Sequence, residues 1–356
     1  MAEKVLMKGN EALAEAALRA GCEAYFGYPI TPQNELAAYM SKRMVQEGGV
    51  YLQAESEIGA INMIYGAAGA GARCMTSTSS PGMSLKSEGI SYIAGADLPA
   101  VIVNVQRGGP GLGGIQPSQA DYWQATRATG HGDFHPIVLA PSTVQEMASS
   151  INEAFDLADE YRTPVIILID GLLGQMMEPV ELPEKTEVTA SKPWAVNPDQ
   201  TGRGQNVINS LHLDPYELAA SNVERFERYA LIKQKEQRVD EYRVNDADIV
   251  IVAFGACARV ARSAVDKARE AGIKAGLIRP ITLVPFPEAA IEAAIPHTAA
   301  FLSVEMNMGQ MVEDVRLVVS GRVPVEFFGH AGGVIPTPNE VFEQIKALDA
   351  SKGRDA

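Results

Sequence analysis

The sequence contains few cysteines and no motif that pairs them. Its three cysteines, Cys22, Cys74 and Cys257, lie far apart, without a CxxC pair or a neighbouring histidine. This scarcity excludes a disulfide scaffold and argues against a zinc site, or an iron–sulfur cluster held by this chain alone. Unpaired cysteines are typical of a reducing compartment, so we expect one here.

The sequence also lacks an excess of positive charge and a long apolar run. Lys and Arg number 30 and Asp and Glu number 44, a formal net charge of −14, which argues against broad binding of nucleic acid or anionic membranes. The uncharged runs 58–72 and 74–85 are short and rich in small residues, so neither predicts a membrane span. The first residues include acids and no apolar stretch, unlike a secretory signal. We therefore expect a soluble cytoplasmic protein.

What is present is an alternation of short apolar segments with helical patterns. The 356 residues predict two domains, at ~150 residues per domain. Strands that are apolar at nearly every position, separated by helices, are typical of a parallel sheet covered on both faces. We expect residues 1–180 to form one doubly wound α/β domain, with strands at 24–26, 50–54, 74–78, 101–105, 136–140 and 164–170.

The second half of the chain predicts a linker and another α/β domain. Prolines and glycines interrupt the pattern between 178 and 214, and residues 215–243 predict one helix of mixed charge that faces water or lies along another subunit. We assign residues 181–244 to this linker and helix, and 245–356 to a second domain. Its expected strands are 248–255, 273–280, 299–306 and 324–328, so the fold class is two doubly wound, mostly parallel-sheet domains.

Charged residues are sparse between Val50 and Ala125, which indicates a core, a subunit interface or a pocket wall. A charge that remains in such a region needs a partner or a role. Only eight occur there: Glu55, Glu57, Arg73, Lys86, Glu88, Asp97, Arg107 and Asp121.

Glu57 stands where a strand gives way to a helix, the edge at which parallel sheets bind ligands. As a charge at a helix N-terminus it would contribute a few tenths to about 1 kcal/mol, and Glu55 could do the same. A carboxylate in an apolar setting can instead share a proton with a heterocyclic nitrogen and act as a relay. Position alone leaves both interpretations open.

Thr31 and Arg107 follow two other expected strands. Pro29 and Pro32 flank the Thr31 segment and restrict its backbone, which would hold one hydroxyl at a strand end, although such turns are often only structural. Arg107 opens RGGPGLGG, where a guanidinium can bind a carboxylate through two parallel hydrogen bonds. The alternative for Arg107 is a salt bridge to Asp121 or Glu88.

Two further patterns are weak. Gly109, Gly111 and Gly114 formally match GxGxxG after a strand, but Pro110 and Pro117 prevent a helix from opening there, which favours a loop over a dinucleotide turn.

His131 and His135 could suggest a metal pair. With one Asp between them and no further ligand, two loop histidines are favoured.

Longer segments carry a resemblance over almost the whole chain. GYPITP, QAESEIGAINMIYGAAGAGARCMTSTSSPGMSLKSEGISY, VNVQRGGPGLGG and HGDFHPIVLAPSTVQEM follow in order. In order and spacing they resemble the catalytic α subunit of the 2-oxoacid:ferredoxin oxidoreductases, which are thiamine diphosphate enzymes. The resemblance implies a pyrimidine-binding domain in 1–180 and a transketolase C-terminal-like domain in 245–356.

The resemblance also implies an activity. It is oxidative decarboxylation of a 2-oxo acid to acyl-CoA and carbon dioxide, with electrons passed to ferredoxin. PSTVQEM and GRGQNVINSLHLDPYE look closest to the type acting on 3-methyl-2-oxobutanoate (2-ketoisovalerate), with the 2-oxoglutarate and pyruvate types as alternatives. After Arg107 the loop to Ser118 contains no basic residue, which disfavours a dicarboxylate.

Individual roles follow from the same resemblance. Glu57 matches the glutamate that hydrogen-bonds N1′ of the aminopyrimidine, and Thr31 and Arg107 match the positions that hold the 2-oxo acid. The loop packed against the cofactor corresponds to Thr78, Ser80 and Gly82.

Two expected features of such an enzyme are missing from this chain. Thiamine enzymes bind the Mg²⁺-diphosphate through GDG followed by a later Asn, and no GDG occurs here; three cysteines are also too few for a cluster. The resemblance therefore implies a β subunit carrying the diphosphate and Mg²⁺ site and a 4Fe–4S cluster. Further clusters and coenzyme A binding are expected on γ and ferredoxin-like δ subunits, with Val50–Ala125 as the candidate interface.

Two other classes remain as alternatives. A non-catalytic assembly subunit would keep the fold and the interface, but would not need Thr31, Glu57 and Arg107 together. A Rossmann-type NAD dehydrogenase conflicts with the prolines in the glycine loop.

Overall fold

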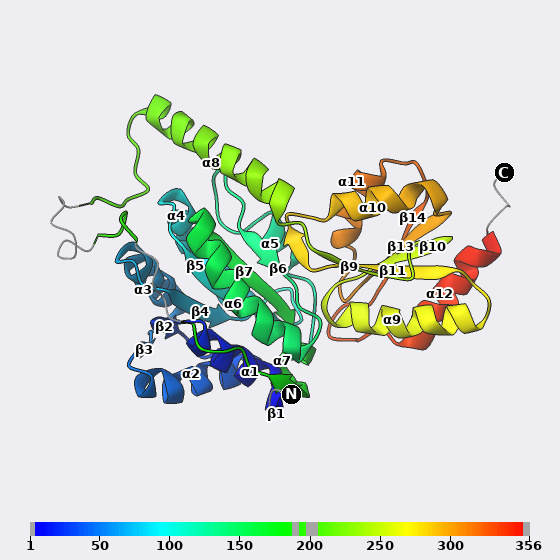
Figure 1. Ribbon diagram of the computed structural model, residues 1–356, viewed down its shortest axis with the longest axis horizontal. Coiled ribbons are helices and arrows are strands. Elements are labelled where there is room, and N and C mark those ends of the chain that lie inside the picture. Colours follow the sequence, from blue (N-terminus) through cyan, green and yellow to red (C-terminus); the bar gives the residue numbers. More distant parts are fainter. Residues whose placement is uncertain (1–3, 187–191, 197–205, 352–356) are drawn as a thin grey trace.

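The architecture is that of two parallel-sheet regions, which confirms the predicted fold class. The computed structural model describes residues 4–186, 192–196 and 206–351. Figure 1 shows the two regions side by side, with α8 lying along the outside of the first. The elements of the first region are β1 (Lys4–Lys8), α1 (Gly9–Arg19), β2 (Ala24–Gly27), α2 (Asn34–Gln46), β3 (Val50–Gln53), α3 (Glu57–Gly69), β4 (Cys74–Thr78), α4 (Ser80–Gly95), β5 (Ala100–Gln106), α5 (Tyr122–Thr126), β6 (Ile137–Leu139), α6 (Val144–Tyr161), β7 (Pro164–Asp170), α7 (Gly171–Gln175) and β8 (Met177–Glu181).

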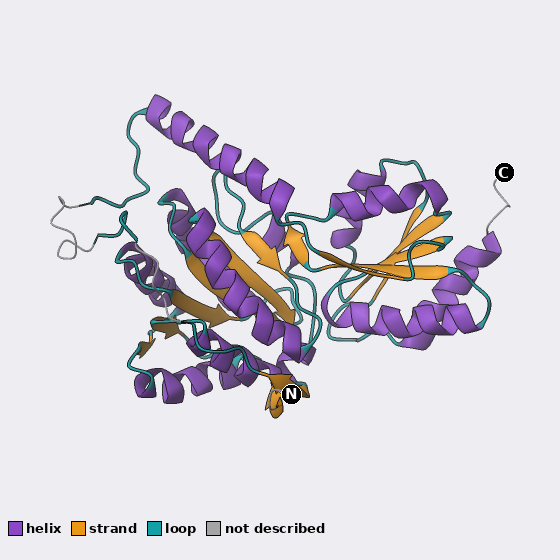
Figure 2. Ribbon diagram, in the orientation of Figure 1, coloured by secondary structure: helices purple, strands orange, loops and turns teal. Residues whose placement is uncertain are grey.

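The second region follows the helix α8. Its sheet has the strand order β14-β13-β10-β11-β9. Helices α9 and α12 cover one face of this sheet, and α10 and α11 lie on the other (Figures 1 and 2). The elements are α8 (Pro215–Lys235), β9 (Val239–Tyr242), β10 (Ile249–Val252), α9 (Gly255–Glu270), β11 (Ala275–Pro280), β12 (Thr282–Val284), α10 (Glu288–Ala294), a short 3₁₀ turn (Ile295–His297), β13 (Ala300–Glu305), α11 (Met311–Val319), β14 (Val325–Gly329) and α12 (Pro338–Ser351).

Burial on both faces of the first sheet explains its continuous apolar strands. The strand order is β12-β6-β7-β5-β4-β2-β3, and all neighbours except β12 and β6 are parallel. Successive side chains of a strand point to opposite faces. Val101 and Val103 therefore join the core under α1 and α6, whereas Ile102 joins the core under α3 and α4.

Local signals set the ends of the long helices. The Thr143 hydroxyl accepts a hydrogen bond from the Glu146 amide at the start of α6, and Arg162 ends this helix with φ 47°. At the start of α8, the Asp214 carboxylate accepts from the Tyr216 and Glu217 amides, and Pro215 occupies the first helical position. These are the cap residues that satisfy the free amides of a first turn.

The sequence prediction is wrong at four places. The helix expected over 215–243 ends at Lys235, and residues 239–242 form β9, antiparallel to β11. In the segment expected to be irregular, β8 pairs antiparallel with β1. Residues 282–284, assigned to the second domain, form β12, which pairs antiparallel with β6 of the first sheet. The helix α12 was not predicted.

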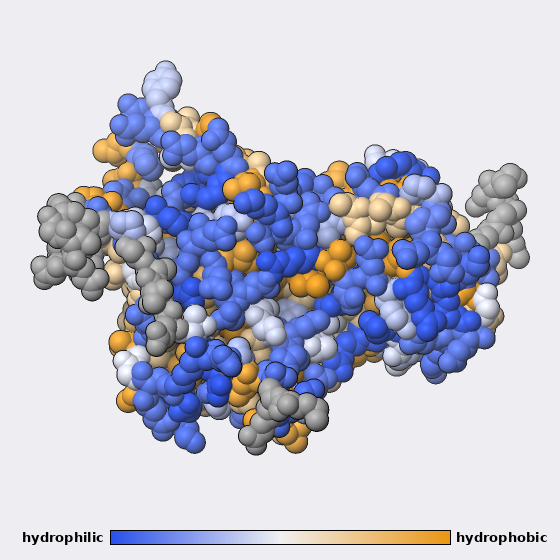
Figure 3. Space-filling model, viewed as in Figure 1, coloured by the Kyte–Doolittle hydropathy of each residue, from blue (hydrophilic) through white to orange (hydrophobic). Residues whose placement is uncertain are grey.

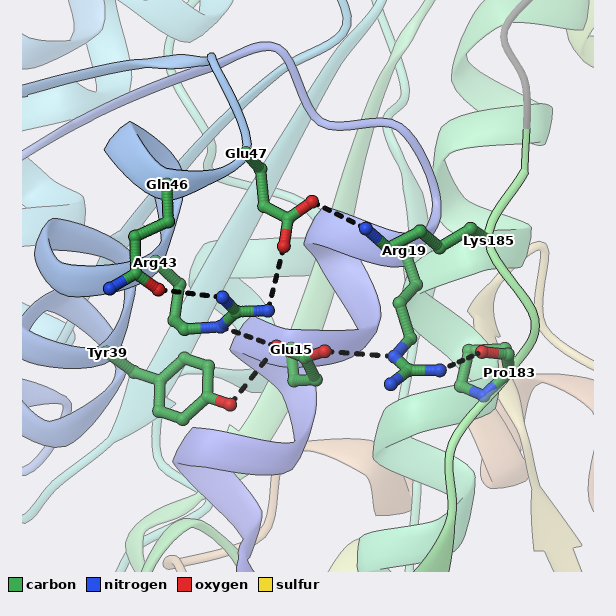
Figure 4. A network of polar contacts seen from close by, with 8 residues as sticks. All are labelled: Glu15, Arg19, Tyr39, Arg43, Gln46, Glu47, Pro183 and Lys185. Carbon is green, nitrogen blue, oxygen red and sulfur yellow. Dashed lines mark hydrogen bonds and ion pairs between the residues drawn. The ribbon is translucent and has the colours of Figure 1, made fainter.

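A buried glutamate ties α1, α2 and the segment after β8 together (Figure 4). The Glu15 carboxylate accepts hydrogen bonds from Arg19 Nε at 2.9 Å, Tyr39 hydroxyl at 3.1 Å and Arg43 Nε at 3.3 Å. Arg19 also donates to the Pro183 carbonyl at 3.1 Å. Because two guanidinium groups and a phenol converge on one carboxylate, this network holds the two helices in register.

On the face viewed in Figure 3, hydrophilic residues cover most of both regions, with hydrophobic residues scattered among them. Within the described ranges, no helix combines the length and the apolar character needed to cross a membrane.

Candidate active site

The topology gathers the predicted site residues at one edge of the first sheet. Strands β3, β2, β4 and β5 are parallel neighbours, so their C-terminal ends meet. The segments after these strands carry Glu57, Thr31, Gly82 and Arg107 respectively. This is the edge at which open parallel sheets bind ligands.

Glu57 is buried at the first turn of α3 and has no hydrogen-bond partner among the described residues. Its exposed fraction is 5%. The cap of α3 is instead Ser56, whose hydroxyl accepts from the Gly59 amide at 3.1 Å. Glu55, the alternative source of helix charge, is exposed. A buried carboxylate without a partner is costly, and its oxygens remain available to a ligand.

Gly82 and Thr78 lie directly against Glu57. A Cβ at Gly82 would overlap the Thr78 hydroxyl oxygen and stand 2.6 Å from Glu57 Oε1. Only a glycine fits there without displacing one of them. The structure thus brings together three of the predicted residues, and the glycine keeps the carboxylate free of a covering side chain.

Arg107 and Thr31 are also brought together. Arg107 Nη1 donates to the Thr31 carbonyl at 2.9 Å and Nη2 to the Leu112 carbonyl at 3.2 Å. Its Nε is buried without a partner in the described structure. The Thr31 hydroxyl accepts from Asn34 Nδ2 at 3.1 Å.

The alternative salt bridges of Arg107 do not form. Asp121 accepts from Ser80 at 2.6 Å and Asn104 at 2.9 Å, and Glu88 accepts from the Tyr92 hydroxyl. Within the described residues Arg107 forms no ion pair, because its guanidinium donates to neutral carbonyls. Arg107 is only 8% exposed and forms no ion pair there, so its guanidinium could bind the carboxylate of a ligand.

Ser80 is engaged inside the chain. Its hydroxyl accepts from the Arg107 amide at 3.0 Å and lies 2.6 Å from the Asp121 carboxylate. Burial raises the pKa of Asp121, although hydrogen bonds from Ser80 and Asn104 oppose that rise. The contacts assign Ser80 to holding the turn that carries Arg107, while a direct contact of Ser80 with the cofactor stays a prediction.

Several buried polar atoms at this edge have no partner in the described part of the protein. They are Ser79 Oγ, Asn104 Oδ1, Gln106 Nε2 and Arg107 Nε, all at or just beyond the ends of β4 and β5. Buried polar groups are nearly always hydrogen-bonded in native proteins. Four orphans in one place fit a site that receives a polar ligand.

Sequence reasoning missed the residues that support the Thr31 turn. Asn10 Nδ2 donates to the Pro32 carbonyl at 2.8 Å, and Gln175 Nε2 donates to the same carbonyl at 3.2 Å. These partners come from α1 and α7, so only the fold places them together. Lys86 was also missed as a site residue, although its presence among eight charges in a sparse region was a signal.

The two histidines form contacts within the chain. His131 Nδ1 lies 3.1 Å from the Ser91 hydroxyl, and His135 packs edge-on against Phe226 and Tyr229. In the ranges the structure describes, no group of three His, Cys, Asp or Glu could hold a metal ion.

Both carboxylate oxygens of Asp170 accept hydrogen bonds within the chain. It accepts from the Leu173 amide at 3.1 Å and the Ala256 amide at 2.9 Å, and so caps two helices, one in each region.

The second region contacts the loop that follows Arg107. Gln119 exchanges hydrogen bonds with Met306, and its side chain also donates to the Phe254 carbonyl at 2.9 Å. A Cβ at Gly333 would overlap the Gln116 side chain. Loop 108–118 is therefore positioned by both regions.

Comparison with known families agrees with this geometry. The model for the thiamine diphosphate-binding domain of pyruvate flavodoxin/ferredoxin oxidoreductase matches residues 15–245, and that for pyruvate:ferredoxin oxidoreductase core domain II matches 247–341. The chain is 49% identical to ketoisovalerate oxidoreductase subunit VorB of Methanothermobacter marburgensis over 344 residues, 96% of this chain and 97% of that protein. It is 38% identical to 2-oxoglutarate synthase subunit KorA of the same organism over 377 residues, 98% of this chain and 100% of that protein.

A solved structure is also similar. It is 2-oxoglutarate:ferredoxin oxidoreductase from Magnetococcus marinus with 2-oxoglutarate, coenzyme A and succinyl-CoA bound. The TM-score is 0.86 at 26% identity, over 98% of this chain and 65% of that one. This chain thus spans about two thirds of the solved polypeptide.

Proposed function

This chain is a member of the pyruvate flavodoxin/ferredoxin oxidoreductase family, a 2-oxoacid:ferredoxin oxidoreductase subunit with a thiamine diphosphate-binding domain, and we propose that it is the catalytic α subunit. The proposed reaction converts 3-methyl-2-oxobutanoate to its acyl-CoA and carbon dioxide, with electrons passed to ferredoxin. The observation that carries the proposal is the buried Glu57 carboxylate, without a hydrogen-bond partner in the described structure, beside the space that Gly82 leaves.

The residues at the site fit the pyrimidine half of thiamine diphosphate. When bound, this coenzyme supplies the nucleophilic carbon and the electron sink that decarboxylation needs. Glu57 would share a proton with the ring nitrogen N1′, as a positioned acid–base side chain can. Thr78 and Gly82 would line the ring at the end of β4. Ser80 remains among the proposed cofactor-binding residues, and it also holds the turn that carries Arg107.

Arg107 and Thr31 would hold the 2-oxo acid. The guanidinium would bind the substrate carboxylate by charge-assisted hydrogen bonds, since in the described residues it donates only to carbonyl oxygens and forms no ion pair. The Thr31 hydroxyl accepts from Asn34 and is free to donate its own hydrogen to a substrate oxygen. The hydrogen bond from Arg107 to the Thr31 carbonyl holds these two groups next to each other.

The branched-chain substrate is supported by the loop and by the relatives. Leu112 is 84% exposed, and Ile115 is also exposed, so the loop after Arg107 offers apolar rather than basic side chains. The VorB relative shares 49% identity and the KorA relative 38%. The 2-oxoglutarate and pyruvate types are the alternatives.

The rest of the machinery is proposed to lie on partners, since the relatives are named as subunits. The three cysteines are buried and free, and Asp170 is occupied as a helix cap. We assign Mg²⁺, the diphosphate site and a 4Fe–4S cluster to a β subunit. Further clusters and coenzyme A binding are assigned to γ and ferredoxin-like δ subunits, with ferredoxin as acceptor.

The candidate interface is the sparsely charged Val50–Ala125 segment. Large hydrophobic side chains are exposed along it: Val50, Leu52, Ile58, Leu85, Tyr92, Leu112, Ile115 and Trp123. The domain division at 180 and 245, and a cytoplasmic location, are parts of the same proposal.

The test is a panel of oxo acids with the assembled complex. Reduction of ferredoxin would be measured with 3-methyl-2-oxobutanoate, 2-oxoglutarate and pyruvate, each with and without coenzyme A. We expect the highest kcat/KM for the branched acid, by roughly 10-fold or more, the discrimination typical of a hydrophobic pocket. A preference for 2-oxoglutarate would move the assignment to that type, and no turnover with any acid would favour the assembly subunit.

A further inference from the structure

Lys86 is a buried cation that the proposed mechanism does not use. It lies on α4 with 0% of its surface exposed. Its Nζ donates to the Thr76 hydroxyl at 2.8 Å, and it forms no ion pair within the described residues. Fully buried lysines are rare and are normally paired with a carboxylate, so this one calls for a reason.

The geometry places Lys86 directly behind the Glu57 site. Thr76 and Thr78 are two apart on β4, so their side chains point to the same face of the sheet. Gly82 and Lys86 are four apart on α4, so they lie on the same face of that helix. Thr78 touches the Gly82 position, and Thr76 receives the Lys86 hydrogen bond. Along β4, the contact between Thr78 and Gly82 is therefore followed by the contact between Thr76 and Lys86. Lys86 lies farther from the C-terminal edge of the sheet than the Glu57 site does.

Helix α3 is held close to this stack. A Cβ at Gly89, one turn beyond Lys86, would stand 2.5 Å from Ile61 Cγ2, one turn beyond Glu57. The two helices are therefore in contact along the turns that carry Glu57 and Lys86. Between such closely packed groups water is excluded and charges interact more strongly than in solvent.

The two charges act on each other. Burial lowers the pKa of Lys86 to about 7, and the negative charge of Glu57 opposes that lowering. A lysine whose role was only to fill the core could be replaced by an apolar side chain without this cost.

We propose that Lys86 is a positioning residue for the coenzyme. In its protonated form Lys86 stabilises the Glu57 carboxylate from behind, and so keeps the shared proton on the ring nitrogen N1′ instead of the carboxyl group. No covalent bond forms or breaks in this step, and the proton only changes its share between nitrogen and oxygen. The inference rests on the proposed function, because it needs the pyrimidine ring at Glu57.

The experiment measures coenzyme affinity rather than turnover. Calorimetry on the assembled complex would compare thiamine diphosphate with an analogue in which ring N1′ is replaced by carbon. The preference for the true coenzyme reports the Glu57 contact, because the analogue cannot share the proton.

The variants separate charge from packing. Lys86→Met leaves the Thr76 hydroxyl without its donor, so the double variant Lys86→Met/Thr76→Val, which removes both partners of the bond, is the version expected to stay folded. Thr76→Val alone is the matched control, because it keeps the charge. We expect the preference to fall about 10-fold in the double variant and to persist in Thr76→Val, because an interacting opposite charge shifts the proton affinity of a carboxyl group by about that order.

The outcomes are distinguishable. If the double variant keeps the same preference as Thr76→Val, while Glu57→Gln abolishes it, the role of Lys86 is refuted and the proposed function stands. If the unaltered complex shows no preference, or if Glu57→Gln leaves it intact, the proposed function fails and the inference fails with it.

Discussion

Replacing the Glu57 carboxylate by an amide should separate activity from stability. In the described structure this carboxylate accepts no hydrogen bond, so Glu57→Gln breaks none within the chain. Ser56 remains as the cap of α3. The substitution removes the charge in the first helical turn, worth about 0.3–1 kcal/mol. It also removes the attraction between Glu57 and Lys86, while it relieves the cost of burying a carboxylate without a hydrogen-bond partner, and these two effects oppose each other. At roughly 2–4 °C of melting temperature per kcal/mol, the shift should be no more than about 4 °C.

The expected effect on turnover is far larger. Acid and base assistance contributes about 10²–10⁴-fold, roughly 2.7–5.4 kcal/mol of barrier. The assay is oxo-acid-dependent reduction of ferredoxin or viologen by the assembled complex, alongside a thermal melt. Glu55→Gln is the matched control, because it makes the same change two residues away on an exposed side chain. Near-full activity in Glu57→Gln would show that Glu57 does not act as a proton relay. Equal losses in both variants would indicate a general charge effect.

Three further outcomes follow from the contacts. Arg107→Ala should raise KM for the oxo acid by about 10-fold or more, the value of charge-assisted hydrogen bonds, and an unchanged KM in steady-state assays would place the substrate carboxylate elsewhere. Gly82→Ala should weaken thiamine diphosphate binding in calorimetry, because its Cβ would stand 2.6 Å from Glu57 Oε1, and unaltered affinity would mean that the ring does not lie there. Glu15→Gln should lower the free energy of unfolding by about 1.5–3 kcal/mol in urea titrations while leaving KM unchanged; full stability would show that the network of Figure 4 contributes little.

The sequence was sufficient for most of the elements and for the edge of the sheet at which the predicted site residues gather. Strands β5 and β7 are apolar at almost every position, which already indicated burial on both faces. Parallel strands direct their C-terminal ends to one edge, and the sequence already placed Thr31, Glu57 and Arg107 after expected strands. Thr31, Glu57, Gly82 and Arg107 converge because the register of neighbouring strands brings those ends together.

Only the tertiary structure decided which distant segments pair. Residues 282–284 and 239–242 are short, and their pairing with β6 and β11 depends on contacts with strands far away in the chain. Local periodicity carries no information about such partners, since pairing is settled by the packing of whole layers.

For the same reason, the sequence could single out Glu57 as a site residue but not Lys86. Glu57 could be singled out by its place between a strand and a helix, a local feature of the sequence. Lys86 sits in a helix, where a lysine is ordinarily exposed. Its burial, its bond to Thr76 and its place behind Glu57 arise only when α3, α4 and β4 pack together. The environment of a charge depends on everything that surrounds it, and that environment exists only in the folded chain.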